Sequence, residues 1–168
     1  NKGYSMLELL VIIALMGIIS VGLFYSFSLV TGQYARECAS NLSTTLDKAR
    51  NYSFSKSASS DAYVEISLGT DGYVATYYAP KSPIDGDAEP GTADYTEFEQ
   101  DTIGKKDVDI ICNLADGSSF NITETERIRI YYDRISGAFK EATRVSGATA
   151  TKAFSPNCKS MTIVIPAN

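Results

Sequence analysis

The chain has 168 residues, a formal net charge of −5 and no histidine. An acidic chain lacks the basic face that binds nucleic acid, so nucleic acid is not expected as its primary partner. The absence of histidine removes the commonest general base and the commonest metal ligand. We also find no nucleophile–base pairing, phosphate-binding glycine loop or zinc-ligand spacing. We therefore predict a protein that is not an enzyme and that holds no cofactor and no metal.

A stretch without any charged side chain runs over 9–35, near the start of the chain. About 20 apolar residues suffice for a helix to cross a bilayer. We therefore expect a hydrophobic helix over 4–30 that inserts in a membrane or packs in the core of a filament. Glu8 stands where this stretch begins, and a carboxylate at membrane depth costs roughly 2.5–3.5 kcal/mol. Such a residue predicts a functional role, because something must offset that cost.

Gly17 and Gly22 interrupt the hydrophobic stretch. Glycine weakens a helix interior by about 1 kcal/mol relative to alanine. One interpretation is close packing between helices, for which small residues are suited, with no role in flexibility. The other is local flexibility of the helix at these two positions.

The pattern becomes amphipathic after about residue 30. Apolar residues then recur at intervals of three or four, which places them on one face of a helix: Tyr34, Cys38, Leu42, Leu46 and Ala49. We expect this segment, 31–56, to be the second half of the same helix and to pack against a sheet. Cys38 lies on the apolar face and is interpreted as a small buried residue.

The remainder, 57–168, is predicted to be a globular domain built on an antiparallel sheet. Its clearest element is a hairpin, in which 63–68 and 73–78 flank the turn 69–72. Val64, Ile66 and Leu68 alternate with Tyr63, Glu65 and Ser67, which predicts a half-buried strand with Glu65 on the face away from the core. Further strands are expected at 108–114, 119–123, 127–132, 138–145 and 161–165.

The segment 79–106 is rich in proline, glycine and acidic residues. It predicts a long acidic loop, with at most a short strand or turn near 95–98. Asp85, Asp87 and Glu89 suggest a calcium loop at first sight. Pro90 stands where that loop requires glycine, so we interpret the segment as an acidic solvated loop.

Three cysteines leave one unpaired if a disulfide forms. Cys112 and Cys158 both fall in the strand-rich half and are the candidate pair. A disulfide between them would close a long loop and stabilise the domain by about 2–4 kcal/mol. The sequence leaves open whether the two thiols pair.

A resemblance to a known family lies in the motif Gly3-Tyr4-Ser5-Met6-Leu7-Glu8 and the apolar run that follows it. This stretch resembles the amino-terminal motif of type IV pilins and type II secretion pseudopilins. That family has glycine before a cleavage site, then usually phenylalanine or methionine, and glutamate as the fifth residue after the cut. Tyr4 and Ser5 are departures from the commoner phenylalanine and threonine. The resemblance covers only the first part of the chain.

The resemblance implies that 1–3 is a residual leader, cleaved after Gly3 by a prepilin peptidase, and that Tyr4 is N-methylated. It also implies an α+β fold in which a long N-terminal α-helix packs on an antiparallel β-sheet. In a filament, the ammonium of Tyr4 in one subunit would meet the Glu8 carboxylate of a neighbour. Pairing would offset much of the desolvation of both charges.

The function expected from the resemblance is that of a major pilin. Copies of the chain would wait in the inner or cytoplasmic membrane, and assembly machinery would add them to an extracellular pilus that serves adhesion, motility or surface interaction. The alternative within the class is a minor pilin, or a pseudopilin of type II secretion or DNA uptake. The alternative outside it is a membrane-anchored binding domain.

Overall fold

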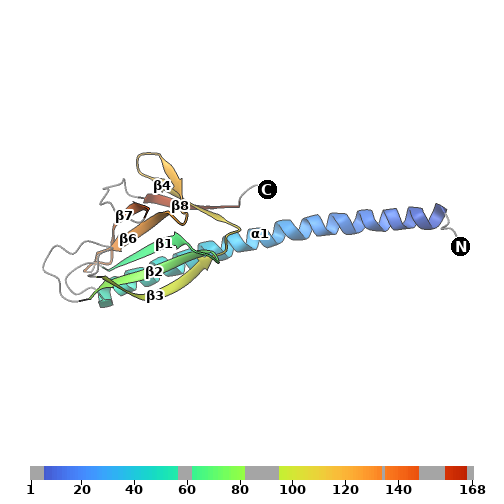
Figure 1. Ribbon diagram of the computed structural model, residues 1–168. Helices are drawn as coiled ribbons and strands as arrows, with labels where there is room; N and C mark the ends of the chain where they lie inside the picture. Colours follow the sequence, from blue (N-terminus) through green and yellow to red (C-terminus); the bar gives the residue numbers. More distant parts are fainter. Residues whose placement is uncertain (1–5, 57–61, 82–94, 134, 148–157, 166–168) are drawn as a thin grey trace. The chain divides into compact units, whose positions relative to one another are not determined.

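The computed structural model describes residues 6–56, 62–81, 95–133, 135–147 and 158–165, which Figure 1 draws as a coloured ribbon. The chain divides into two compact units, 1–33 and 34–168. The helix α1 (Met6–Lys56) crosses the boundary between them. Its side chains are described in two stretches, 6–21 and 32–55. We name these the first and second stretches of α1.

The expected fold class, a long N-terminal helix packed on an antiparallel sheet, is wrong. The two described stretches of α1 are shorter, and the boundary between the two units, after residue 33, falls at the start of the second stretch. Only the second stretch contributes buried residues to the strand-rich core. Strands dominate the larger unit, and they form two sheets rather than one. Local sequence patterns cannot show that the helix crosses from one compact unit into another or that the strands form two sheets, because both features depend on contacts between distant residues.

The larger unit contains eight described strands, all paired antiparallel. One sheet has five strands in the order β3 (Tyr95–Gly104), β2 (Tyr73–Pro80), β1 (Tyr63–Leu68), β6 (Glu126–Tyr132) and β7 (Phe139–Ser146). The other has three strands in the order β5 (Ser119–Asn121), β4 (Asp109–Leu114) and β8 (Cys158–Val164).

The predicted hairpin is confirmed as β1 and β2. Val64 faces Tyr77 and Leu68 faces Tyr73 across the ladder. The turn closes with a hydrogen bond that the Gly69 N–H donates to the Gly72 carbonyl at 2.8 Å. The later predicted strands are also present, as β4 to β8, with ends shifted by a few residues.

The interpretation of 79–106 as a long loop is wrong in its last part. β3 occupies Tyr95–Gly104 and pairs with β2 along its length, so it forms one edge of the five-stranded sheet. Its sequence misled because an edge strand with a solvated face accommodates acidic residues. Asp85, Asp87, Glu89 and Pro90 lie outside the described residues.

The core of the larger unit lies between the second stretch of α1 and the two sheets. The apolar stripe predicted from helical spacing contributes to it: Cys38, Leu42 and Ala49 are buried, and Tyr34 and Leu46 pack at its edge. The helix approaches β3 closely at Gly104. A Cβ at that glycine would lie 2.7 Å from the Cys38 sulfur, so the contact requires a residue without a side chain.

Candidate functional site

The first stretch of α1 exposes apolar side chains around its whole circumference. Every residue over 6–21 is exposed, from 42% at Ile12 to 90% at Met6 among the large apolar ones. Soluble proteins rarely expose apolar surface over so long a segment, and such surface marks an interaction site. The large apolar side chains involved are Met6, Leu7, Leu9, Leu10, Val11, Ile12, Ile13, Leu15, Met16, Ile18, Ile19 and Val21.

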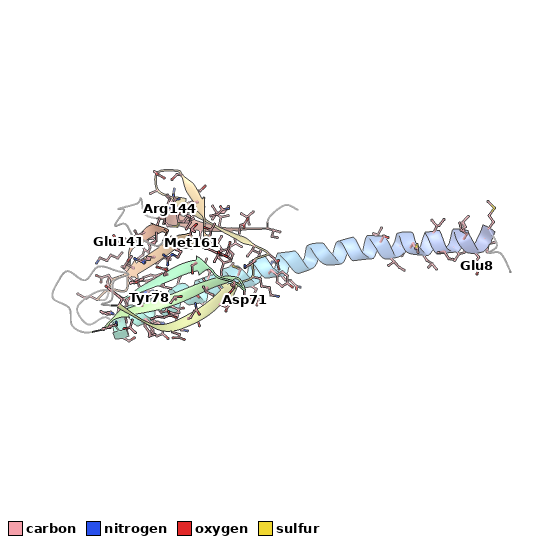
Figure 2. All side chains as sticks on the ribbon, viewed as in Figure 1. Glu8, Asp71, Tyr78, Glu141, Arg144 and Met161 are labelled. Carbon is pink, nitrogen blue, oxygen red and sulfur yellow. A yellow bond between two sulfur atoms is a disulfide. The ribbon has the colours of Figure 1, made fainter. Side chains whose placement is uncertain are left out.

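Glu8 is the one charged residue in this first stretch, and it lies in the first turn of α1. Figure 2 shows its side chain near the N-terminal end of the described helix. A carboxylate in the first turn is favoured by the helix dipole. No described residue forms an ion pair with Glu8. The charge is therefore available to a group from outside the described part of the chain.

The sequence also predicted a processing site at Gly3 and Tyr4 and helix flexibility at Gly17 and Gly22. Gly3 and Tyr4, the predicted processing site, lie outside the described residues. Gly17 lies within α1, and an added Cβ there would meet nothing within 4 Å. Gly22 lies within the helical bounds as well. The predicted flexibility at these glycines stays a prediction, although Ser20 bonds back to the Met16 carbonyl at 2.7 Å, a pattern that slightly weakens helices.

Among the described residues, no helix combines the length and the apolarity needed to cross a bilayer.

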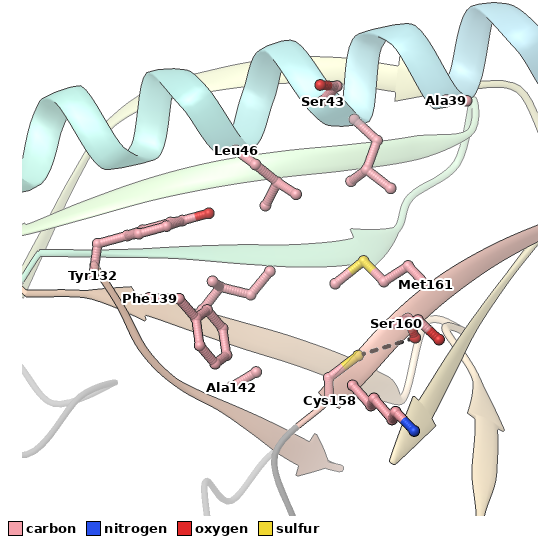
Figure 3. A pocket seen from close by; sticks show the side chains of 12 residues that line it. Ala39, Ser43, Leu46, Tyr132, Phe139, Ala142, Cys158, Ser160 and Met161 are labelled. Atoms are coloured by element: carbon pink, nitrogen blue, oxygen red, sulfur yellow. Dashed lines mark hydrogen bonds between the residues drawn. The ribbon is translucent and has the colours of Figure 1, made fainter. Parts of the chain in front are cut away.

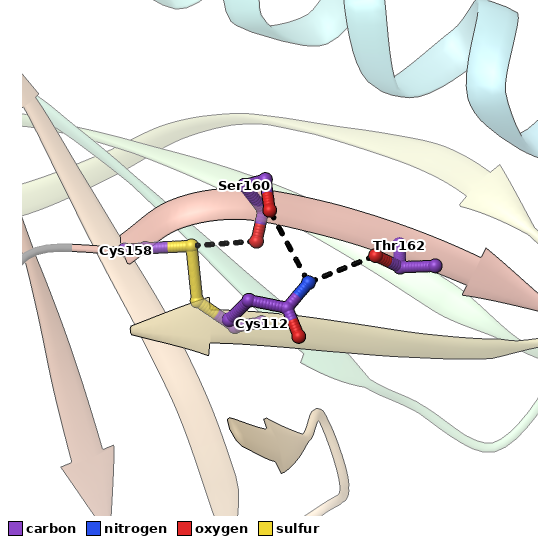
Figure 4. The surroundings of a disulfide bond; sticks show 5 residues. Cys112, Cys158, Ser160 and Thr162 are labelled. Carbon is purple, nitrogen blue, oxygen red and sulfur yellow. Dashed lines mark hydrogen bonds between the residues drawn. A yellow bond between two sulfur atoms is a disulfide. The ribbon is translucent and has the colours of Figure 1, made fainter. Parts of the chain in front are cut away.

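Cys112 and Cys158, whose pairing the sequence left open, form a disulfide in the structure, with their Cα atoms 6.0 Å apart. The bond joins β4 to β8 within the three-stranded sheet (Figure 4). Asn113 adds two side-chain hydrogen bonds to the same strand, to the hydroxyls of Ser160 and Thr162. The last described strand is thus held to the sheet by covalent and polar contacts together.

Lys48 on the second stretch of α1 connects the helix to β3 through charged contacts. Its Nζ lies 2.5 Å from the Glu99 carboxylate and 2.7 Å from that of Asp101. Tyr52 donates a hydrogen bond to Glu99, and Tyr77 donates one to Asp101 at 3.0 Å. Desolvation would lower the pKa of Lys48, but its bonds to the two carboxylates outweigh burial and raise it.

The pKa values of Glu99 and Asp101 are lowered, whereas that of Lys48 is raised. The hydrogen bond from Lys48, followed by that from Tyr52, lowers the pKa of Glu99. Burial raises the pKa of Asp101, but the hydrogen bonds from Lys48 and Tyr77 outweigh it, so the net shift is downward. Sequence reasoning missed this network, because it assigned Glu99 and Asp101 to a loop.

A second network lies on the face of the five-stranded sheet opposite the core. Glu65 of β1 stands directly across from Arg129 of β6, whose Nε donates to it at 2.7 Å. Arg127 donates to the other carboxylate oxygen at 2.6 Å. The Arg129 guanidinium also lies 5.3 Å from the ring centre of Tyr63, a cation–π distance.

Tyr63 belongs to a cluster of tyrosines beside this ion pair, which it forms with Tyr78, Tyr95 and Tyr131. The ring centres of its three neighbours lie 4.9, 5.1 and 5.4 Å away, respectively. Burial raises the pKa of Tyr63 and of Tyr131. Alternation along β1 predicted a polar outward face for Glu65, and it gave no signal that this carboxylate would be buried.

Cys38 is the remaining cysteine and it is buried. Burial, followed by the nearby charge of Glu37, raises the pKa of its thiol to about 11. The thiol is therefore protonated at neutral pH and is a poor nucleophile. The interpretation of Cys38 as a packing residue agrees with this environment.

No group of three or more metal-ligating side chains occurs in the part of the chain that the structure describes. Comparison with models of known protein families finds none that matches this chain. Comparisons with curated proteins and with solved structures find no match either.

Proposed function

We propose that this chain is the structural subunit of a filament of the type IV pilin class, and that it polymerises through the first stretch of α1. The observation that carries the proposal is the exposed apolar surface of 6–21 with its single carboxylate, Glu8. It is supported by the motif Gly3-Tyr4-Ser5-Met6-Leu7-Glu8, which resembles the pilin processing and assembly signal.

Burial of the exposed apolar side chains of 6–21 would supply the free energy of assembly. Fully burying a leucine, isoleucine or methionine side chain stabilises by about 1.5–3 kcal/mol. The first stretch presents many such side chains on all sides. Packing against copies of the same stretch covers all sides at once, whereas a groove on another protein covers only one. A bundle of identical helices is therefore the arrangement we propose.

Glu8 fixes how far each helix in that bundle is shifted along the axis relative to its neighbour. A lone carboxylate inside an apolar bundle is costly, and pairing it with an amine of a neighbouring subunit removes most of that cost. Cleavage after Gly3 would supply the amine as the new terminus at Tyr4. The resulting filament would be extracellular, with its subunits drawn from the membrane by assembly machinery that includes a prepilin peptidase.

The test is assembly of a Glu8→Val variant in the cell that makes the protein. Cell-surface material is sheared off, and the chain in the sheared and membrane fractions is quantified. We expect Glu8→Val to abolish filaments while the chain still accumulates at the membrane. Glu37→Val is the matched control, because Glu37 is an exposed carboxylate on the second stretch of α1. Normal filaments from Glu8→Val contradict the proposal.

Imaging the same sheared material separates the alternatives. Abundant thin fibres made of the chain support a major subunit. Trace amounts at fibre tips would indicate a minor pilin or a pseudopilin. The absence of any polymer would favour a membrane-anchored binding domain.

A further inference from the structure

We propose that the larger unit has a binding site for a single-chain amphiphile, an alkyl chain that ends in an anionic head group. The site is a cavity of about 530 Å³ between the second stretch of α1 and the strands β6, β7 and β8. Figure 3 shows the helix forming one wall and the strands the other. The proposal is independent of filament assembly, because it concerns only residues of the larger unit.

The walls of the cavity are apolar. Leu42 and Leu46 come from the helix, Ile130 and Tyr132 from β6, Phe139 from β7 and Met161 from β8. Its volume lies in the range of small-molecule sites, about 300–1,000 Å³. An alkyl chain of about ten to twelve carbons suits a cavity of this size and lining. Phe139 is 49% exposed although it lines the cavity, so a ligand would cover apolar surface that is now open to water.

One cation lines this apolar cavity. Lys159 is part of its lining, and no described residue forms an ion pair with its ammonium group. An unpaired ammonium at an apolar cavity is the feature that selects a negatively charged head group over a neutral one. Ser43 and Ser160, also in the lining, supply hydroxyl groups that can donate hydrogen bonds to such a head group.

A strand irregularity places the lysine there. On β8, Ser160 pairs with Asn113 of β4, and Cys158 pairs with Leu114, the next residue of that strand. Lys159 is therefore the extra residue of a bulge and has no partner on β4. Bulges re-aim a side chain and are common beside binding sites. The disulfide from Cys112 to Cys158 fixes the strand at this point.

The test uses the full chain with its disulfide intact and a dodecanoate that carries a photoreactive diazirine at the end of its alkyl chain. After irradiation, mass spectrometry locates the labelled peptides. Localisation matters because the first stretch of α1 is itself apolar and exposed. We expect label on peptides that contain Leu46, Phe139 or Met161. Unlabelled dodecanoate should compete at least tenfold better than dodecan-1-ol.

Two variants and one control distinguish binding in the cavity from nonspecific hydrophobic binding. Ser43→Phe fills the cavity from an exposed helix position and should reduce cavity labelling at least tenfold. Lys159→Glu should weaken dodecanoate binding at least tenfold. Lys106→Glu makes the same charge change at an exposed position that does not line the cavity, and it should leave labelling unchanged. Thermal melting verifies that each variant is folded.

Any of four results would overturn the proposal. They are label confined to 6–21, equal cavity labelling in Ser43→Phe, equal loss in Lys159→Glu and Lys106→Glu, and competition by dodecan-1-ol as strong as that by dodecanoate.

Discussion

Arg129→Met removes the guanidinium that lies opposite the buried carboxylate of Glu65. The side chains of Arg129 and Glu65 are only 8% and 6% exposed. Methionine retains most of the length and apolar volume of arginine, so the substitution tests the charge more than the packing. It also removes the cation–π contact with Tyr63.

The expected loss of unfolding free energy depends on how deeply Arg129 and Glu65 are buried and on the Glu65 charge that remains in the variant. Breaking a buried ion pair by removing one partner costs about 3–5 kcal/mol, because the other charge stays buried. Arg127 still donates to Glu65 at 2.6 Å in the variant, which places the expected loss at the lower end, about 3 kcal/mol. Arg127→Met should cost less, about 1 kcal/mol, because that side chain is 25% exposed and the Arg129 bond remains.

A double variant tests whether the unpaired charge of Glu65 is the source of the loss. Replacing both members of a buried pair by apolar residues is often neutral or stabilising. Glu65→Met combined with Arg129→Met should therefore be more stable than Arg129→Met alone. Arg127, which is partly exposed, can turn toward water once Glu65 is gone.

The assay is urea denaturation of the full chain in a mild non-ionic detergent, followed by circular dichroism. The free energy of unfolding is compared for the wild type, the two single arginine variants and the double variant. A loss below 1 kcal/mol for Arg129→Met would refute the argument. So would a double variant less stable than Arg129→Met, since the stranded charge would then not be the source of the cost.

Three further predictions concern the larger unit. Gly137→Ala should lower the free energy of unfolding by about 1–2 kcal/mol in thermal melts. The reason is that Gly137 has φ of +63° and that an added Cβ would lie 2.4 Å from a ring carbon of Phe54. Gly117→Ala is the control and should cost less, because Gly117 has φ of +87° but an added Cβ there would meet nothing within 4 Å. Cys112→Ser should cost about 4 kcal/mol in urea denaturation, given the 46-residue separation of the disulfide, and an unchanged midpoint would contradict this. Lys48→Met should raise the pH at which acid unfolding begins, measured by circular dichroism. The lowered pKa values of Glu99 and Asp101 stabilise the fold above their unfolded values near 4, and this contribution disappears as pH falls through the folded values. Lys106→Met is its control, and equal onset in the two variants would count against the network.

Local patterns in the sequence predicted the elements that have strong periodicity. The alternation of Val64 and Ile66 gave the strand β1, and the spacing of Cys38, Leu42 and Ala49 gave the buried face of the helix. These signals are local, since each depends on which face of one element meets the core.

Features that depend on distant partners were missed or mistaken. β3 is recognisable as a strand through its pairing with β2, because its own sequence is acidic and weakly alternating. The burial of Glu65 requires Arg129, which lies 64 residues further along the chain. The expected fold of one long helix packed on one sheet was wrong, because the division of the chain into two units and of the strands into two sheets depends on contacts between distant residues.

The candidate assembly site was identified from one motif and one apolar run. The structure adds that 6–21 is exposed on all sides and that no described residue pairs with Glu8.

Electron cryomicroscopy of fibres sheared from the cell surface tests assembly through 6–21 most directly. We predict a fibre whose axis is a bundle of these segments from many copies, with each Glu8 carboxylate within hydrogen-bond distance of a terminal amine of a neighbour. A fibre built from the sheet surfaces, with 6–21 outside the bundle or Glu8 facing solvent, would contradict the account.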